Sequence, residues 1–144
     1  MAEQHIGQLL GEVIRCMEAD LQGYLRDAGH ADVRPSQFAF FRHMRPEGLR
    51  LTELAERAHV TKQSVGELVT YLEARGNLER LPDARDGRVR IVRLTAQGEQ
   101  SRTAAFQAIR EIEATCARGV GARRVDELRR TLARIAEFGP ESDR

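Results

Sequence analysis

The chain has 144 residues, of which 41% are hydrophobic and 31% charged, and its formal net charge is +1. This length suits one domain with a buried core, and the composition excludes a wholly disordered chain. Because the charges nearly balance, any basic surface for nucleic acid has to come from their local placement.

The N-terminal segment MAEQHIGQLL has an acid where a secretory signal carries basic residues, and no apolar run approaches the ~18 residues of a membrane span. We therefore expect a cytoplasmic protein without membrane contact. Cys16 and Cys116 lie far apart, and no histidine or cysteine pair has the spacing of metal ligands. No metal site and no cofactor are expected.

The N-terminal part predicts a long helix followed by a short one. Apolar residues recur at spacings of three and four from Ile6 to Tyr24, which predicts an amphipathic helix over about residues 3–28. The segment SQFAFFRHM predicts a short second helix that is capped near Ser36. Its inward-facing residues are expected to be Phe38, Phe41 and Met44.

Two helices that meet at a tight turn are predicted next. LTELAERA has leucine and alanine on one face, and KQSVGELVTYLEARG resumes the helical period after a break at HVT. Thr61 is placed to cap the second helix, because its hydroxyl can accept hydrogen bonds from the amides of the first turn. Gly76 is a suitable stop, with Arg75 near the negative end of the helix dipole.

A basic hairpin and two more helices complete the chain. NLERL and VRIVRL alternate like strands and flank the turn PDARDG, which predicts a β-hairpin. Thr95 is expected to cap a helix that runs to about Arg118 and whose inward stripe ends at Cys116. After a break at GVGARR, apolar residues from Val125 to Phe138 predict the last helix.

A short helix, a tight turn, a longer helix and a hairpin follow one another in the order of a winged helix-turn-helix. A helix can enter the DNA major groove, while an arginine-bearing hairpin reaches the phosphates and the minor groove. Interleaved acids can orient these arginines through forked hydrogen bonds. The outward polar residues of the second helix are Lys62, Gln63, Ser64, Glu67 and Thr70. They are base- and phosphate-reading types, although for any one of them a solvated surface is an equally good interpretation.

The sequence from Leu51 to Gly98 resembles the DNA-binding lobe of the MarR family of bacterial regulators. Its most specific feature is D-x-R-D-x-R, followed by a strand and L-T-x-x-G. In this chain the motif consists of Asp83, Arg85, Asp86, Arg88, Leu94, Thr95 and Gly98. The resemblance implies that Arg88 enters the minor groove with Asp86 as its orienter, whereas Arg85 contacts phosphate or braces the wing. Glu67 stands where many relatives have a basic or neutral residue, so a contact with cytosine is left open instead of a phosphate contact.

The resemblance extends over the whole chain and implies a mainly α fold with a small β-hairpin. It implies a single MarR-like domain over residues 1–144, with a winged helix-turn-helix lobe at 33–94. Dimerisation helices are then expected at 1–32 and 119–144, with part of 95–118. The expected partners are an operator in double-stranded DNA and a second copy of the chain. The alternative for the apolar stripes of the first and last helices is that they only close a bundle within one chain.

Many members of the family respond to small phenolic or aromatic acids. Candidates to line a cleft for such an effector are Met17, Tyr24, Phe38, Phe41 and Arg42, with the arginine meeting a carboxylate. The alternative is that the aromatics belong to the core and that Arg42 is solvated. Cys16 lies in the first helix, as does the reactive thiol of the family's organic-hydroperoxide sensors. Because Glu12 and Asp20 flank it and would raise the pKa of a thiol, a buried and inert Cys16 is expected, and the same holds for Cys116.

The predicted function is that of a DNA-binding transcriptional regulator, a repressor that binds a pseudo-palindromic operator as a homodimer and is released by a small aromatic or phenolic ligand. No enzyme and no catalytic residue are expected, because G-x-S-x-G, the phosphate-binding G-x-x-x-x-G-K-[ST] and a telling acid–base pair are missing from the sequence. Two alternatives are a winged helix that contacts only protein and a thiol-based redox regulator that uses Cys16.

Overall fold

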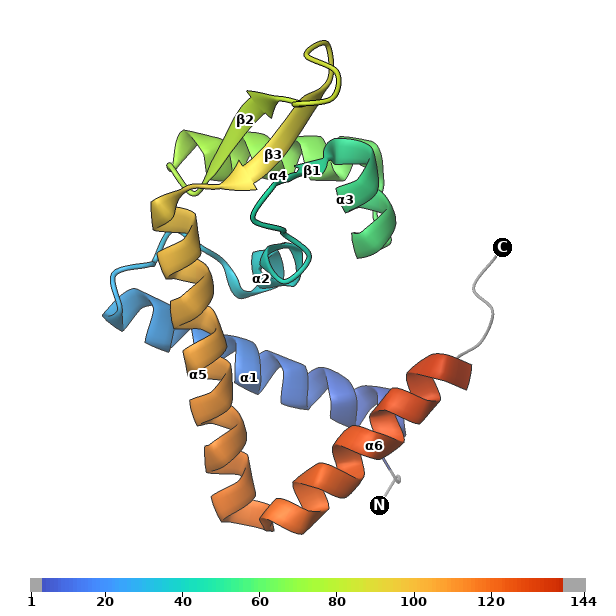
Figure 1. Ribbon diagram of the computed structural model, residues 1–144. Coiled ribbons are helices and arrows are strands. Elements are labelled where there is room, and N and C mark those ends of the chain that lie inside the picture. Colours follow the sequence, from blue (N-terminus) through green and yellow to red (C-terminus); the bar gives the residue numbers. More distant parts are fainter. Residues whose placement is uncertain (1–3, 139–144) are drawn as a thin grey trace. The chain divides into compact units, whose positions relative to one another are not determined.

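The computed structural model describes residues 4–138 of the chain (Figure 1). Its helices, in chain order, are α1 (Ile6–Asp27), α2 (Pro35–Phe41), α3 (Leu51–Ala58), α4 (Lys62–Ala74), α5 (Ala96–Val120) and α6 (Ala122–Phe138). Its strands are β1 (Leu49–Arg50), β2 (Leu78–Pro82) and β3 (Arg90–Leu94). The predicted fold class, mainly helical with a small β-hairpin, is confirmed. Among residues 4–138 no helix combines the length and the apolar character that a membrane crossing requires.

The chain forms two compact units that divide within α5, between Ala108 and Ile109. The first unit holds α1 to α4, the sheet and the first part of α5, and it contains the whole predicted lobe of residues 33–94. The second unit holds the rest of α5 together with α6. Gly121 separates these two helices with a φ of +98°, a left-handed conformation that favours glycine.

Most helix ends agree with the predictions to within a few residues. α1 begins at Ile6, about three residues later than predicted, because the side chain of His5 caps it by accepting a hydrogen bond from the amide of Gln8. α2 is preceded by Arg34 as its N-cap, so the predicted cap at Ser36 is wrong by two residues. Pro35 occupies the first helical position there, where its missing N–H costs no hydrogen bond.

The strands of the described residues form one antiparallel sheet in the order β1-β3-β2. The predicted hairpin is confirmed as β2 and β3, with Leu78 opposite Leu94 and Pro82 opposite Arg90. β1 was not predicted, because two residues are too few to show alternation. Gly48 precedes it with a φ of +91°, and a Cβ at this position would stand 2.9 Å from the carbonyl oxygen of Val92. A glycine is therefore needed for β1 to approach β3.

The core of the first unit lies between the sheet and helices α2 to α4. Its largest fully buried apolar residues in this region are Val33, Phe41, Leu54, Val65, Val69, Leu72 and Val92. The predicted inward positions of Phe41 and Met44 are confirmed, whereas Phe38 is half-buried and packs edge-on against Phe106 at 4.9 Å between ring centroids. Since α4 gives three residues to this core, its opposite face is left to solvent.

Close backbone packing joins the end of β3 to the start of α5, and it explains the L-T-x-x-G pattern. The hydroxyl of Thr95 accepts a hydrogen bond from the amide of Gly98 at 3.1 Å, which confirms the predicted cap. A Cβ on Gly98 would stand 2.0 Å from the carbonyl oxygen of Asn77, which is an impossible distance. That same carbonyl accepts a hydrogen bond from the amide of Thr95 at 3.1 Å. This bond holds the start of α5 close to the turn that contains Asn77.

A buried polar network fastens the same junction. The side chain of Asn77 is fully buried and donates to Asp32 at 2.7 Å, while its oxygen lies 3.0 Å from the hydroxyl of Ser101. Ser101 is also fully buried, and its hydroxyl lies 2.9 Å from Nδ1 of His30. Buried polar groups cost free energy unless they are paired, so these contacts fix the α1–α2 loop, the turn after α4 and α5 relative to one another.

The predicted inward stripe of the long C-terminal helix is partly wrong. Ala105 and Ile112 are buried, but Cys116 is exposed. In the second unit α6 lies against the face of α5 that carries Glu113, which accepts a hydrogen bond at 3.1 Å from Arg129. The α5 residues beside α6 also include Ala114 and Ala117 but not Cys116, and the predicted buried thiol is not found at this position.

Candidate nucleic-acid interface

The N-terminus of α4 is capped as predicted. The hydroxyl oxygen of Thr61 accepts from the amide of Ser64 at 3.1 Å. The hydroxyl of Thr61 lies 2.8 Å from Oγ of Ser64, to which it donates, so Ser64 keeps its own proton for another acceptor. A hydroxyl donor and free first-turn amides at a helix N-terminus suit a phosphate group.

The outward face of α4 carries all the polar residues that were predicted there. Lys62, Gln63, Ser64, Glu67 and Thr70 are all exposed. The buried face consists of Val65, Val69 and Leu72. Because each residue turns a helix by about 100°, Gln63, Glu67 and Thr70 lie near the centre of the opposite face.

These three residues, Gln63, Glu67 and Thr70, interact with other groups of the chain. Nε2 of Gln63 donates to Oε1 of Glu67 at 3.4 Å. The hydroxyl of Thr70 donates to the carbonyl of Gly66 at 2.9 Å and accepts from Nη2 of Arg80 at 3.0 Å. The donor capacity of Thr70 is thereby used within the chain, and a contact between this residue and a base remains a prediction.

Arg80, on β2, joins the hairpin to α4 and was not singled out from the sequence. Besides its bond to Thr70, its Nε lies 3.1 Å from Oε2 of Glu73, an ion pair that lacks the alignment of a hydrogen bond. The two partners of Arg80, the hydroxyl of Thr70 and the carboxylate of Glu73, lie three residues apart on one side of α4. Nothing in the sequence distinguishes this arginine from the others of the hairpin, because the pairing depends on how the sheet lies on α4.

The loop between β2 and β3 is a compact turn that presents the predicted wing residues. The amide of Asp83 donates to the carbonyl of Val89 at 2.8 Å, which closes the loop. Within it, the carboxylates of Asp83 and Asp86 accept from the backbone amides two residues on, those of Arg85 at 2.9 Å and Arg88 at 3.0 Å. Arg85, Asp86 and Arg88 are all exposed.

The forked hydrogen bonds expected at the tip of the wing are found at its base instead. Asp86 contacts the backbone of Arg88, and within residues 4–138 it makes no hydrogen bond to that guanidinium. Forked pairs are formed by Arg50 with Asp83 and by Arg93 with Glu79, at 2.7 Å for the shorter bond of each pair. The physical reason is that a short loop turns its acids toward its own amides, which leaves the arginine side chains at the tip pointing to solvent.

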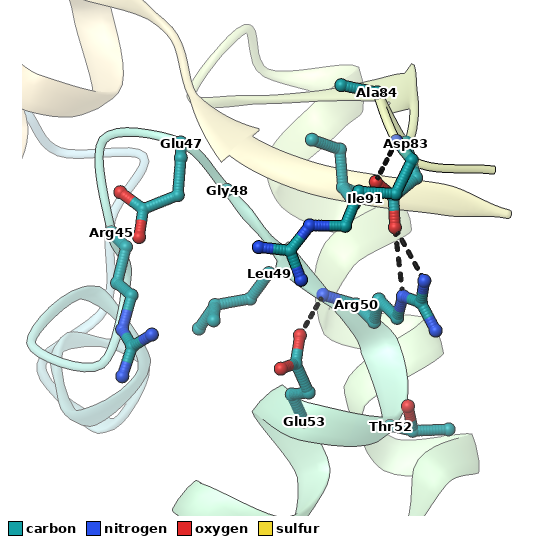
Figure 2. A pocket seen from close by; sticks show the side chains of 11 residues that line it. Arg45, Glu47, Gly48, Leu49, Arg50, Thr52, Glu53, Asp83, Ala84 and Ile91 are labelled. Carbon is teal, nitrogen blue, oxygen red and sulfur yellow. Dashed lines mark hydrogen bonds and ion pairs between the residues drawn. The ribbon is translucent and has the colours of Figure 1, made fainter. Parts of the chain in front are cut away.

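The pair of Arg50 and Asp83 connects the start of α3 to the wing (Figure 2). Nε and Nη2 of Arg50 donate to Oδ2 of Asp83 at 3.0 and 2.7 Å. The hydrogen bond from the Arg85 amide, followed by that from Arg50, lowers the pKa of Asp83 below its ordinary value. The pKa of Arg50 is raised, mainly by its hydrogen bond to Asp83. Sequence reasoning missed Arg50 because its partner lies 33 positions away.

A pocket of about 490 Å³ lies beside this ion pair, between β1, the start of α3 and the wing. Figure 2 shows its lining, which includes Arg45, Glu47, Arg50, Glu53 and Asp83. Glu53 accepts a hydrogen bond from the amide of Arg50 at 2.9 Å and so caps α3. Three arginines and three acids line the pocket, and three of these six residues, Arg50, Glu53 and Asp83, are hydrogen-bonded to one another within the chain.

The residues predicted to bind an effector do not gather in this pocket. Met17 and Phe38 are half-buried, and Tyr24 and Arg42 are exposed. Phe41 is fully buried within the core of the lobe. Its assignment to a ligand cleft is therefore corrected, since a ligand could reach its ring only by displacing core packing.

Cys16 is exposed in α1, which corrects the expectation of a buried thiol. The buried residues of this helix are Leu21 and Leu25, both in its C-terminal part, so the turn that carries Cys16 has few neighbours within the chain. Among the described residues, no group of three or more histidine, cysteine or acidic side chains is arranged to hold a metal ion.

Residues 31–89 match the model of a protein family described as the MarR family. No curated protein matched the chain at a significant level. Among solved structures, the transcriptional repressor CouR bound to a 23-mer DNA duplex is 23% identical, with a TM-score of 0.77 and 92% of each chain covered. CouR from Rhodococcus jostii RHA1 bound to p-coumaroyl-CoA is 22% identical, with a TM-score of 0.71 over 98% of this chain and 96% of that one.

Two further structures have the same fold. The MepR–DNA complex of S. aureus is 19% identical, with a TM-score of 0.77 over 94% of this chain and 99% of that chain. The reduced form of MarR from E. coli is 22% identical, with a TM-score of 0.77 over 94% and 98%. Residues 31–89 of this chain are therefore similar to the MarR family, and the chain shares the winged helix-turn-helix fold of these structures.

Proposed function

We propose that this protein is a DNA-binding transcriptional regulator that represses by binding a pseudo-palindromic operator as a homodimer. The observation that carries the proposal is that one folded lobe presents both an exposed polar face on α4 and an arginine-bearing wing. Helix α4 would enter the major groove, and Arg85 and Arg88 would reach phosphate and the minor groove. The structures of CouR and MepR bound to DNA support this assignment. Such a role belongs in the cytoplasm and requires no enzymatic step.

Exposed apolar side chains on α1 and α6 support the homodimer. Those with the largest exposed fractions are Ile6, Val13, Ile14, Leu128, Ile135 and Phe138. α6 has no buried residue at all within Ala122–Phe138, so its apolar stripe contributes little to stability in a single chain. Burial of apolar surface by a second copy would contribute about 25 cal/mol per Å².

Selection of bound sequences from a random DNA pool tests the proposal most directly. A dimer should enrich two half-sites with centres ~10 bp apart, because two recognition helices separated by about 34–36 Å meet successive turns of one DNA face. Binding should also weaken steeply with salt, because several phosphates are neutralised. A winged helix used only for protein contact would show no affinity for duplex DNA. Sedimentation as a monomer at micromolar concentration, with and without DNA, would contradict the dimer.

We further infer that a small aromatic or phenolic acid releases the protein from DNA. CouR in complex with p-coumaroyl-CoA supports this class of ligand. Met17, Tyr24, Phe38 and Arg42 are the remaining candidates to contact it, with the exposed guanidinium of Arg42 meeting the carboxylate. Titration of the operator complex with p-coumarate should release DNA from the wild type and require more ligand with Arg42→Ala. Equal release curves for the two proteins would remove Arg42 from the site.

The exposed thiol of Cys16 favours a second candidate, regulation by oxidation. An organic hydroperoxide would then abolish operator binding by the wild type, and Cys16→Ser would keep it. Cys116→Ser serves as the matched control, because Cys116 is also exposed. Operator binding that resists the peroxide in the wild type would exclude this mechanism.

A further inference from the structure

We propose that Glu67 is a specificity-determining residue that selects a cytosine at one position of each half-site, by accepting a hydrogen bond from the cytosine amino group. This inference rests on the proposed function, because it concerns the surface of α4 that would enter the major groove. It assigns a particular base to a particular side chain and explains why an acid is present on a surface that faces phosphates.

Glu67 occupies the middle of the exposed face of α4. Gln63 precedes it by four residues and Thr70 follows it by three, so the three side chains lie in one row opposite the buried face. Residues at the edges of a recognition helix reach the DNA backbone, while those in the central row point at the base edges. A carboxylate in that row therefore meets the floor of the groove.

The carboxylate of Glu67 has no cation to neutralise it among residues 4–138. The other acid on the exposed side of α4, Glu73, is paired with Arg80 at 3.1 Å, whereas no such pair involves Glu67. The hydrogen bond that Glu67 does accept comes from the neutral amide of Gln63, at 3.4 Å. Its second oxygen is left to accept a hydrogen bond from a partner outside the chain.

Hydrogen-bond acceptors predominate in this row. Nε2 of Gln63 donates to Glu67, and the amide oxygen of Gln63 accepts no hydrogen bond from any residue in 4–138. The hydroxyl proton of Thr70 is donated to the carbonyl of Gly66, so this side chain has no proton left for a base. A surface of acceptors is complementary to donors, and in the major groove the bases offer donors only through the amino groups of cytosine and adenine.

Cytosine is favoured over the other three bases for electrostatic reasons. Guanine presents two acceptors in the major groove, and thymine presents an acceptor and a methyl group, so both repel or fail to pair with a carboxylate. Adenine offers an amino group, but its N7 acceptor lies directly beside it. Cytosine offers the amino group without an acceptor of its own, which makes it the base that a carboxylate discriminates best.

Space beside Glu67 is consistent with a close approach of DNA. Gly66, the preceding residue, is within the helix, and a Cβ added to it would meet nothing within 4 Å. Glycine inside a helix lowers its stability relative to alanine. This space lies on the flank of α4, about 100° round the helix from Glu67, and nothing in the first unit fills it, so the groove wall can approach that flank closely.

The test compares the wild type with Glu67→Gln in parallel selections from a random DNA pool, followed by titration of four duplexes that differ only at the implicated position. The wild type should prefer cytosine there by at least about fivefold over guanine, the lower end of what one good base contact discriminates. Glu67→Gln should lose this preference while the other positions of the half-site stay unchanged. Glu111→Gln is the matched control, because it removes the same charge from an exposed position of α5 and should leave the preference intact.

Far-ultraviolet circular dichroism would establish that all three proteins are folded to the same extent. If the wild type and Glu67→Gln keep the same base preference at every position, the inference about Glu67 is overturned and the proposed function stands. The same conclusion follows if the wild type prefers adenine, guanine or thymine at the position that Glu67→Gln alters. Enrichment of no sequence by either protein would overturn the proposed function and this inference with it.

Discussion

The carboxylate of Asp83 accepts both Nε and Nη2 of Arg50 on a single oxygen, at 3.0 and 2.7 Å, and uses its other oxygen to accept the amide of Arg85. One side chain therefore holds the loop of the wing in its turn and fastens the wing to the start of α3. The orientation of the wing relative to α4 depends on this pair on one side of the sheet and on Arg80 on the other.

The first prediction concerns acid. Because the folded pKa of Asp83 is lowered, the stability that its ionised form contributes is fully present above the unfolded value of about 4 and is lost as the pH falls through the folded value. Urea unfolding measured from pH 6 to pH 2 should therefore show that acid lowers the free energy of unfolding less for Asp83→Asn than for the wild type. If the free energy of unfolding falls equally with pH in the two proteins, the ion pair of Arg50 and Asp83 is too well solvated to contribute to stability.

The second prediction concerns the packing of the start of α5 against the turn between α4 and β2. Gly98→Ala should lower the free energy of unfolding by about 1–3 kcal/mol or more, because the added methyl group would collide with the carbonyl oxygen of Asn77. Chemical denaturation measures this loss. Gly119→Ala is the control, since a Cβ at that position of α5 meets nothing within 4 Å and should stabilise the helix slightly.

The third prediction separates stability from binding at one residue. Gly66→Ala should raise the free energy of unfolding by about 0.5–1 kcal/mol, because a Cβ there meets nothing within 4 Å and glycine is a poor helix former. The same methyl group should weaken operator binding, since it stands beside the row that faces the groove. A variant that is both more stable and equally tight on DNA would show that the groove wall does not approach Gly66.

The fourth prediction ranks the arginines of the hairpin. Arg88→Ala should weaken operator binding more than Arg93→Ala, because Arg88 is exposed on the wing while both bonded nitrogens of Arg93 are held by Glu79. Asp86→Ala should act in the same direction as Arg88→Ala but less, through the loss of its bond to the Arg88 amide. Titration of a labelled operator gives the three affinities. A larger effect of Arg93→Ala would show that the wing is placed wrongly on DNA.

The fifth prediction uses the single lysine of the chain. Lys62 lies in the first turn of α4 and is exposed, and an amine-selective reagent has no other target in this chain except the α-amine. Both amines should be labelled in the free protein, and operator DNA should protect Lys62 until salt releases the complex. Mass spectrometry quantifies both sites, with the α-amine as the internal reference. Unchanged labelling of Lys62 under saturating operator would remove α4 from the interface.

The sequence alone predicted the order of the elements, because helical spacing, strand alternation and capping residues are local properties. Thr61 and Thr95 were recognised as caps from their place before an amphipathic run, and both make the expected bonds. The exposed row on α4 followed from the position of its apolar residues. The D-x-R-D-x-R motif located the wing, and the family match over residues 31–89 agrees with the resemblance.

The tertiary structure decided everything that depends on contacts between distant segments. Arg50 and Arg80 are ordinary arginines in the sequence, and only the folded lobe shows that each pairs with a specific acid on another element. The acids of the wing proved to bind backbone amides rather than the arginines at its tip, since a short loop satisfies its own amides first. Periodicity likewise predicted an apolar side for the helix of Cys16 without showing whether any part of the chain covers it. A pattern defines which side chains share a face, but burial and pairing are set by what the rest of the fold places against that face.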